Sequence, residues 1–205
     1  MAALLACGVT TASAQSAGQA RLGITAGMNV SNITKQQTDS RIGFNVGLRG
    51  EYNFTDNVYG NLGLIFSQKG SRTKESAGAL GFEASGTFTQ NPGYIELPLH
   101  VGYRFNMGNG VSIFGETGPY FAFGICGKEK FAVDSNVGIK KDVDTDFFKE
   151  DGSNANVFDF GWGLRAGVEV SQFQISLGYE HGITKVWEKT DCRNSNFMVG
   201  LAYMF

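Results

Sequence analysis

The sequence has little proline, little cysteine and almost no net charge. Of 205 residues only 3 are proline and 3 are cysteine, and the formal net charge is -2. So few cysteines do not make a disulfide-rich scaffold, and a near-neutral chain lacks the basic excess that sustained nucleic-acid binding requires. No stretch approaches the roughly 18 apolar residues of a membrane-spanning helix. These absences argue against nucleic acid as a partner and against a helical membrane anchor.

Glycine and phenylalanine are abundant instead. The chain has 29 glycines and 17 phenylalanines, and many glycines and aromatics with almost no proline favour a tightly curved all-β protein. Mean hydropathy is -0.12. A membrane barrel averages to such a value, because its lipid-facing apolar residues alternate with polar lumen residues. Bulk hydropathy therefore does not separate a soluble protein from a membrane barrel.

Apolar and polar residues alternate along most of the chain. In the clearest segment Phe44 and Leu48 lie on one face, and Asn45 and Arg49 lie on the other. A period of two residues indicates strands with unlike faces. The pattern predicts eight strands, at residues 21–30, 41–54, 58–69, 94–105, 111–125, 157–170, 172–184 and 196–205.

Three features favour a membrane barrel over a soluble barrel with an apolar interior. The polar face is rich in glycine and carries charges of both signs, which suits a narrow, packed lumen. Short connections near Thr55, Gly108 and Ser171 alternate with long ones at 31–40, 70–91, 126–156 and 185–195, and aromatic residues recur at strand ends as in an interfacial girdle. We predict an all-β fold, an eight-stranded antiparallel up-and-down transmembrane β-barrel in the bacterial outer membrane.

The N-terminus resembles an export signal. Ala2 to Val9 is a short apolar run, and Ala12-Ser13-Ala14 has the small-residue pattern that signal peptidase recognises. We expect a signal peptide at residues 1–14, whose positive n-region is missing, and a barrel domain at 15–205. Acylation of Cys7 as a lipoprotein is the alternative, although it leaves almost no apolar region before the cysteine.

Several short motifs resemble the PorT-like outer-membrane β-barrel family (outer membrane protein beta-barrel domain) of Gram-negative bacteria. The likeness covers nearly all of the chain after residue 14, and its carriers are Gly27-Met28-Asn29-Val30-Ser31, Ser67-Gln68-Lys69-Gly70, Tyr94-Ile95-Glu96-Leu97-Pro98-Leu99, Glu116-Thr117-Gly118-Pro119-Tyr120 and the terminal Phe205. The resemblance implies an outer-membrane location rather than a defined activity, and some members support protein secretion to the cell surface. Phe205 looks like the signal by which the barrel-assembly machinery recognises its clients.

Charged residues on the inward faces form the main candidate site. Counting equally from the turn at Gly108 pairs Phe105 with Val111 and His100 with Glu116, and Arg165 falls at a similar depth. Buried charges need partners, so we expect a lumen charge cluster. It comprises His100, Glu116, Arg165, Arg49 and Arg104. Its role is either structural, stiffening the wall, or that of a proton- or cation-sensitive constriction, because histidine titrates near neutral pH.

Three other features have a functional and a simpler interpretation. His181 near the outer rim is a candidate base for a lipid-modifying enzyme, but Ile183 stands where a serine is needed, and an interfacial histidine is the simpler interpretation. The segment 142–146 resembles the start of a calcium loop but lacks the glycine and glutamate of an EF-hand, which favours a solvated loop. Cys126 and Cys192 form either a disulfide between outer loops or two free thiols.

The sequence supports a non-enzymatic outer-membrane barrel whose outer loops bind or scaffold an unknown ligand or protein, with an accessory role in surface protein secretion implied by the resemblance. A narrow porin-like ion channel is the first alternative, although eight strands enclose a bore that side chains fill. A lipid-modifying enzyme is the weaker alternative. We expect no cofactor and no metal, and contacts with outer-membrane lipid and lipopolysaccharide.

Processing after Ala14 is the first testable prediction. It removes 14 of 205 residues and leaves a chain of 191 that begins at Gln15, because the small side chains at Ala12 and Ala14 fit the peptidase. The intact mass of protein extracted from membranes measures this directly. A first residue Cys7 carrying lipid would show that the lipoprotein alternative is correct.

Overall fold

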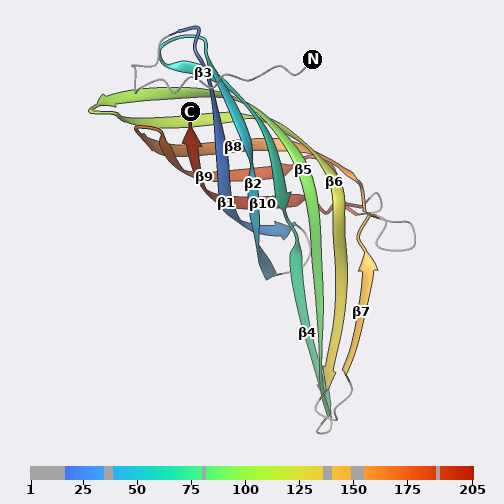
Figure 1. Ribbon diagram of the computed structural model, residues 1–205. Helices are drawn as coiled ribbons and strands as arrows, with labels where there is room; N and C mark the ends of the chain where they lie inside the picture. The colour runs from blue at the N-terminus through green and yellow to red at the C-terminus, as the bar shows by residue number, and fades with distance from the viewer. Residues whose placement is uncertain (1–16, 35–38, 80–81, 136–139, 149–154, 188–189) are drawn as a thin grey trace, which may run out of the picture.

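The computed structural model describes residues 17–34, 39–79, 82–135, 140–148, 155–187 and 190–205 (Figure 1). Within 74–85 and 133–144 it describes the backbone alone. The expected signal peptide at 1–14, including Cys7, lies outside the described residues. No helix in the described part of the chain is long and apolar enough to cross a bilayer, which says nothing about crossing by strands.

The described residues fold into antiparallel strands joined by turns. All eight predicted strands form, and two further strands appear between them. The strands are β1 Ala20–Ile33, β2 Asp39–Asn53, β3 Val58–Gln68, β4 Ser71–Ala79, β5 Phe82–Gly108, β6 Val111–Ser135, β7 Lys140–Asp146, β8 Phe158–Val170, β9 Phe173–Gly182 and β10 Asn194–Met204.

Eight of these strands close into a ring. Each pairs with the next in the order β1-β2-β3-β5-β6-β8-β9-β10, and β10 returns to β1 along a ladder from Gly23–Met204 to Ile33–Asn194. Closure leaves no open edge within the ring, as a structure in hydrocarbon requires. The predicted eight-stranded barrel is therefore confirmed.

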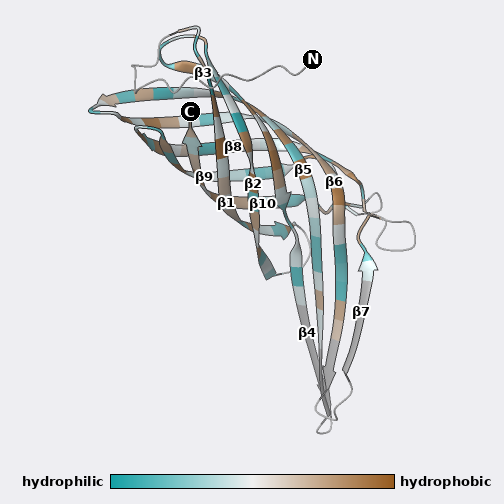
Figure 2. Cartoon of the chain, viewed as in Figure 1, coloured by the Kyte–Doolittle hydropathy of each residue, from teal (hydrophilic) through white to brown (hydrophobic). Residues whose placement is uncertain are grey.

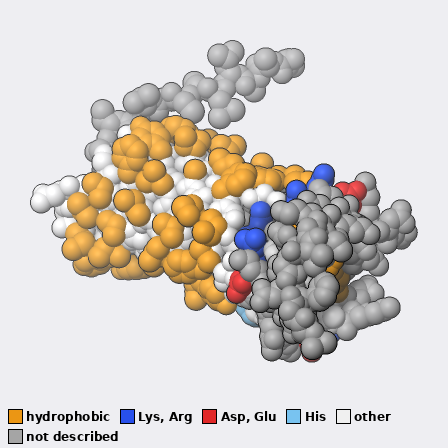
Figure 3. Space-filling view, turned by 90° about the horizontal axis from the view of Figure 1, so that it is seen from below, with side chains coloured by type: hydrophobic (Ala, Val, Ile, Leu, Met, Phe, Trp, Pro, Cys, Tyr) orange, Lys and Arg blue, Asp and Glu red, His pale blue; other side chains and the backbone are white. Residues whose placement is uncertain are grey.

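Hydrophobic and hydrophilic residues alternate along the ring strands (Figure 2), and their side chains alternate between the exposed outer surface and the buried lumen. Outward residues such as Ile42 and Leu164 keep 66% and 56% of their surface exposed, whereas the inward Arg49 and Glu51 each keep 2%. Apolar side chains cover the outside of the wall (Figure 3). A one-residue slip of any strand would exchange these faces, so the apolar pattern fixes each strand's side-chain orientation.

The short turns lie at the end of the barrel that carries the C-terminus (Figure 1). Asn109 and Gly110 both have positive φ, 54° and 74°, and form a two-residue hairpin loop between Gly108 and Val111. Such loops favour asparagine and glycine, because both tolerate the left-handed region.

The predicted register of this hairpin was wrong by two residues. Phe105 lies opposite Ile113 rather than Val111, and Glu116 lies opposite Gly102 rather than His100. The turn is centred on Asn109 and Gly110 rather than on Gly108, which shifts the register by three residues. The irregularity between Asn106 and Gly108 takes one residue back, since a β-bulge adds a residue to one strand only. A shift of two residues leaves every side chain on its predicted face.

Four strands continue beyond the ring at the other end of the barrel and form a long projection, here called the arm (Figure 1). It consists of β4, the first part of β5, the last part of β6, and β7, paired in that order. β5 has 27 residues and β6 has 25, whereas about 9 to 11 suffice to cross a membrane. The outer connections expected at 70–91 and 126–156 are therefore largely strand rather than loop.

The arm escaped prediction because its strands lack a continuous apolar face. Outside the membrane both faces of a sheet meet water, so apolar residues such as Phe88 and Phe131 are isolated among polar ones. Segment 142–146, interpreted from sequence as a solvated loop, lies within β7 and pairs with β6 from Lys128–Asp146 to Asp134–Lys140. An extended strand does not curl around an ion as an EF-hand loop does.

Charge placed in the middle of the lipid face should impair the barrel. Leu99 and Leu164 are 52% and 56% exposed on that face, so we expect Leu99→Arg and Leu164→Arg to destabilise the barrel by about 2 to 4 kcal/mol each. Urea titration of the folded, heat-modifiable band measures the change. Leu99→Met is the control and should leave the midpoint unchanged; equal tolerance of Leu99→Arg would place this face away from lipid.

Candidate functional site

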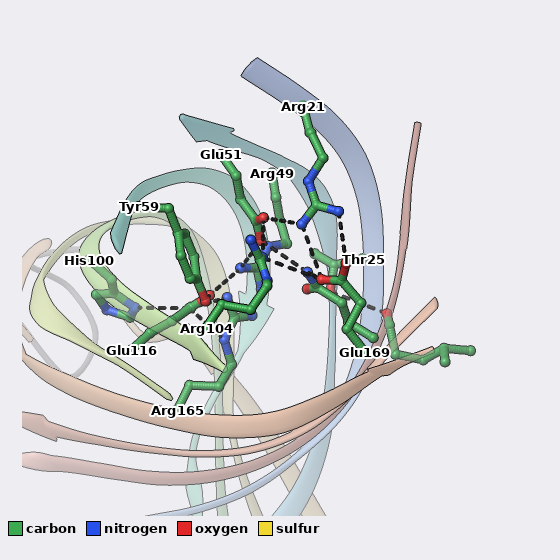
Figure 4. Close-up of polar contacts among 12 residues, drawn as sticks. Arg21, Thr25, Arg49, Glu51, Tyr59, His100, Arg104, Glu116, Arg165 and Glu169 are labelled. Atoms are coloured by element: carbon green, nitrogen blue, oxygen red, sulfur yellow. Dashed lines mark hydrogen bonds and ion pairs between the residues drawn. The ribbon is translucent and has the colours of Figure 1, made fainter. Parts of the chain in front are cut away.

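Inward-facing side chains near the short turns form a layer of ion pairs, here called the basal network (Figure 4). They project from seven strands of the ring, and every second residue on each strand points inward. The members are Arg21, Arg49, Glu51, Tyr59, Arg104, Glu116, Arg165, Glu169 and Gln174.

Glu116 on β6 lies at one centre of the basal network. Its Oε1 accepts hydrogen bonds from Arg49 Nη2 at 2.7 Å and from the Tyr59 hydroxyl at 2.8 Å. Its Oε2 accepts from Arg165 Nε at 2.9 Å and Nη2 at 2.5 Å. His100 Nδ1 lies 3.8 Å from the same oxygen. Glu116 thus joins strands β2, β3 and β8, with β5 close by.

Glu51 and Glu169 form the other centre. Arg104 Nη2 lies 2.6 Å from Glu51 Oε2 and 3.3 Å from Glu169 Oε2. Arg21 lies between the same carboxylates, 2.5 Å from Glu51 and 2.8 Å from Glu169. Gln174 donates to both at 3.0 and 2.8 Å. These contacts cross the lumen and connect residues up to 148 positions apart in the chain.

The basal network carries an excess of positive charge. It contains four arginines and three glutamates, while Tyr59 and Gln174 are neutral. The Arg104 guanidinium also lies 4.2 Å from the Tyr59 ring centre, in the geometry of a cation–π contact. Because ions removed from water are costly unless paired and hydrogen-bonded, the contacts to several partners are what allow seven charges in so narrow a bore.

The structure brings most of the predicted lumen cluster together. Arg49 and Arg165 contact Glu116, and His100 lies near it. Arg104 pairs with Glu51 and Glu169, in the other half of the basal network. Glu116 and Arg165, placed at the same depth by counting, are directly opposite in the β6–β8 ladder.

Sequence reasoning missed five members of the basal network. Glu51 and Glu169 alternate in step with the inward-facing Arg49 and Arg165, but nothing in the alternation shows that they meet. The alternation of the sequence indicates only that the five missed residues lie on inward faces. They are Arg21, Glu51, Tyr59, Glu169 and Gln174.

A second buried layer, here called the apical network, lies toward the outer end of the lumen. Lys69 Nζ lies 2.7 Å from Glu96 Oε2 and 3.0 Å from Glu180 Oε2. The ammonium also lies 4.3 Å from the Tyr120 ring centre. Tyr120 donates to Asp159 at 3.2 Å. One lysine thus faces three carboxylates, so negative charge is in excess here, opposite to the basal network.

A chamber of about 40 Å³ separates the two networks. This is room for only a few water molecules, since one needs roughly 10 to 15 Å³ by the same measure. Asn61 Nδ2 and both ring nitrogens of His100 border the chamber and have no hydrogen-bond partner among the described residues. Buried polar groups in a polar cavity are satisfied by water, so the chamber is suited to ordered water.

Aromatic and aliphatic side chains cover the outer mouth of the lumen. Ile33, Phe147, Ala155, Val186 and Cys192 form a buried cluster, with Phe148 and Trp187 packed against it. We call this the mouth cluster. Phe148 also makes an edge contact with Tyr94, with ring centres 5.5 Å apart. The mouth cluster thereby joins the strands of the lumen to the outer connections.

Cys126 and Cys192 are free thiols in the structure, which is the second of the two alternatives. Cys126 is exposed on β6, whereas Cys192 is buried in the mouth cluster. A disulfide requires both sulfur atoms at bonding distance, and the two side chains occupy different environments. Among the described side chains, no group of three His, Cys, Asp or Glu residues could hold a metal ion.

His181 lies on the outer wall of β9, stacked on Tyr179 with ring centres 6.5 Å apart. Ser195 stands directly opposite it on β10, a neighbour that sequence reasoning did not identify. Ser195 Oγ shares a hydrogen bond with the Tyr179 hydroxyl at 3.1 Å, and His181 Nδ1 makes none among the described residues. A catalytic base oriented by a carboxylate would use that nitrogen, so the contacts favour the interfacial role.

The fold and its charged lumen are those of an outer-membrane barrel, and comparison with known families agrees. Residues 13–188 match the family described as outer membrane protein beta-barrel domain, and the chain belongs to that family. The protein is therefore located in the bacterial outer membrane. A search of curated proteins found no match.

Several solved structures resemble the chain. Ail, the attachment invasion locus protein of Yersinia pestis, is 20% identical, with 92% of this chain and 99% of that chain covered and a TM-score of 0.38. Neisserial surface protein A is 13% identical, covering 91% and 97%, with a TM-score of 0.43. OprG from Pseudomonas aeruginosa is 12% identical, covering 94% and 99%, with a TM-score of 0.42.

Removing the charge of Glu116 should destabilise the barrel. Glu116→Gln leaves Arg49 and Arg165 without their carboxylate, and breaking a buried pair costs about 3 to 5 kcal/mol. The urea midpoint of the purified barrel in detergent measures the loss. The control is Glu129→Gln on the arm, where the carboxylate accepts from Gln90 at 2.9 Å, and there we expect less than about 1 kcal/mol. Equal effects of the two changes would contradict a stabilising basal network.

Proposed function

We propose that this protein is a closed, non-enzymatic outer-membrane barrel that displays its arm outside the cell as a binding or scaffolding surface. The observation that supports this is the arm itself. A chain that only needed to cross the membrane could end β5 and β6 at the rim, yet both continue with β4 and β7 as a four-stranded sheet. An exposed sheet is a suitable platform for contact with another molecule.

The edges of the arm offer a specific kind of contact. β7 pairs only with β6, and β4 pairs with β5 apart from two residues beside β2, at Ser71 and Arg72. The outer edge of each therefore carries backbone N–H and C=O groups with no strand beside them among the described residues. Such edges accept an extended segment of another chain by strand addition. An extended protein segment is thus the partner that fits best.

The lumen favours a closed barrel over the channel alternative. Ions crossing it would have to pass the basal network, the small chamber, the apical network and the mouth cluster in turn. Arg104 and Glu51 keep only 1% and 2% of their surface exposed, which supports a bore filled by side chains rather than by a hydrated path. The networks support an architectural role, in which the interior holds the wall rigid beneath the arm.

The PorT-like resemblance would give the arm a more particular role. If the chain shares that family's part in secretion, the arm is the segment that would contact an exported protein at the cell surface. Lipopolysaccharide around the barrel and the assembly machinery recognising Phe205 complete the proposed partners. Phe205 is 48% exposed at the end of β10, where its N–H donates to the Leu22 carbonyl at 2.7 Å.

A variant without the arm, here called the armless variant, tests whether the barrel folds independently of the surface that it displays. Replacing 72–89 and 129–145 each by Asn-Gly leaves two-residue turns between the paired residues Ser71 and Gln90 and between Lys128 and Asp146. We expect it to remain heat-modifiable, because the pairing of the ring strands with one another is kept and β2 loses only its contact with Arg72. A photo-crosslinker in place of the exposed Arg72 should give protein adducts on intact cells, and one in place of Asp56 in a periplasmic turn should not.

Planar-bilayer recordings test the closed lumen. We expect no single-channel steps from the intact protein and none from the armless variant, since the networks lie within the ring. Regular conductance steps from the intact protein would support the channel alternative instead. Absence of any adduct from the Arg72 position, with the barrel folded and exposed on cells, would overturn the display function.

A further inference from the structure

The lipid-facing wall is not uniformly convex, because a groove of about 650 Å³ crosses it where β6 and β8 pair. One row of cross-strand neighbours runs Tyr103, Gly115, Ala166 and Leu177 over β5, β6, β8 and β9. The two small residues form the floor of the groove and the two large ones form its walls.

The floor is open rather than filled by neighbouring side chains. A Cβ atom built on Gly115 would meet no heavy atom within 4 Å. The walls project from the surface, since Tyr103 keeps 55% and Leu177 keeps 54% of the surface area of the residue exposed. The groove is therefore a true depression in the surface, and a slender apolar group lying in it would contact protein on three sides.

Polar groups gather toward the outer end of the groove. Trp162 Nε1 donates to Thr117 Oγ1, which borders the groove, at 2.8 Å. Tyr179, a wall residue, shares its hydroxyl with Ser195 at 3.1 Å and stacks on His181. His181 Nδ1 is left without a hydrogen-bond partner among the described residues. Tryptophan, tyrosine and histidine with this arrangement are typical of the level where lipid headgroups begin.

The surroundings of the groove indicate what occupies it. It is continuous with the exposed apolar outer surface of a barrel located in the outer membrane, so its occupant is hydrocarbon. Its polar end faces outward, which requires a lipid whose headgroup lies in the outer leaflet. We propose that the groove binds one acyl chain of a lipopolysaccharide molecule, with the polar end of that lipid at Tyr179, Ser195 and His181.

A second depression on the wall shows why the first is selective. It holds about 290 Å³ around Gly50 and Leu62 and is bordered mainly by apolar atoms of β1, β2 and β3. None of the tryptophan, histidine or serine groups of the first groove borders it. Apolar burial alone does not distinguish one lipid from another, whereas polar groups at one end fix the ligand's orientation.

Filling the floor tests the proposal. The barrel, refolded in dodecyl maltoside, is mixed with lipid A, and the bound fraction is measured by native mass spectrometry. We expect one lipid A per barrel. Gly115→Leu should lower the bound fraction about tenfold, roughly the effect of failing to bury two methylene groups. It should fold, because its side chain points into open space, and a heat-modifiability gel checks this.

Two further variants complete the experiment. Ala166→Leu fills the same floor from β8 and should also reduce binding, which keeps the test valid if Gly115→Leu fails to fold. Ala26→Leu on β1 is the control, since Ala26 faces lipid opposite Val46 and Leu201 and does not border the groove. It should bind lipid A as the unmodified barrel does.

Three outcomes would overturn the proposal. Unchanged binding in both groove-filling variants would show that lipid A does not bind in the groove. Equal binding of phosphatidylethanolamine would show that the site does not select lipopolysaccharide. A dimer that Gly115→Leu abolishes would assign the groove to a second copy of the chain. The inference rests on the membrane location and not on the proposed display function, so crosslinking at the arm and lipid binding at the groove fail independently.

Discussion

The whole structure depends on one constraint, which is that backbone N–H and C=O groups have no water to bind inside the hydrocarbon of a membrane. Each unsatisfied group there costs several kcal/mol, so strands must close on themselves, and here β10 returns to β1 over eleven paired positions. Closure then fixes one face of every ring strand toward lipid and the other toward a narrow bore. The alternation of the sequence is the direct consequence of that geometry.

The narrow bore explains the two charged networks. Side chains of eight strands meet in its centre, and charges placed there cannot be solvated, so they bind one another. The basal network has an excess of arginine and the apical network an excess of carboxylate, with His100 and a small chamber between them. Opposite excesses at neighbouring depths attract each other, which makes the interior a continuous electrostatic brace for the wall.

Outside the membrane, water can bind unpaired backbone groups, so the strands of the arm need not close into a ring. The strands of the arm meet water on both faces and at their edges, so neither closure nor an apolar face is required of them. On the lipid-facing wall, Gly115 and Ala166 are small where most outward residues are large. Their backbones keep the pairing of the ring, and their small side chains leave a groove open toward lipid. Function in this fold is therefore free to develop at the projection and on the outer surface while the ring stays unchanged.

The sequence by itself determined the eight ring strands, their inward and outward faces and the short turns, because a period of two residues and turn-forming residues such as Asn109 and Gly110 are local properties. It also placed Glu116 and Arg165 at one depth, since both are counted from nearby turns. The tertiary structure alone decided the rest. The position of the turn at Asn109 and Gly110, together with the irregularity beside Gly108, moved the β5–β6 register by two residues, and the curvature of the ring brought Arg21 to Glu169 across 148 positions. The arm had no apolar face to reveal it, and the groove exists only where four strands align. Each of these depends on which strands become neighbours and in what register, and a pattern read along one strand does not contain that information.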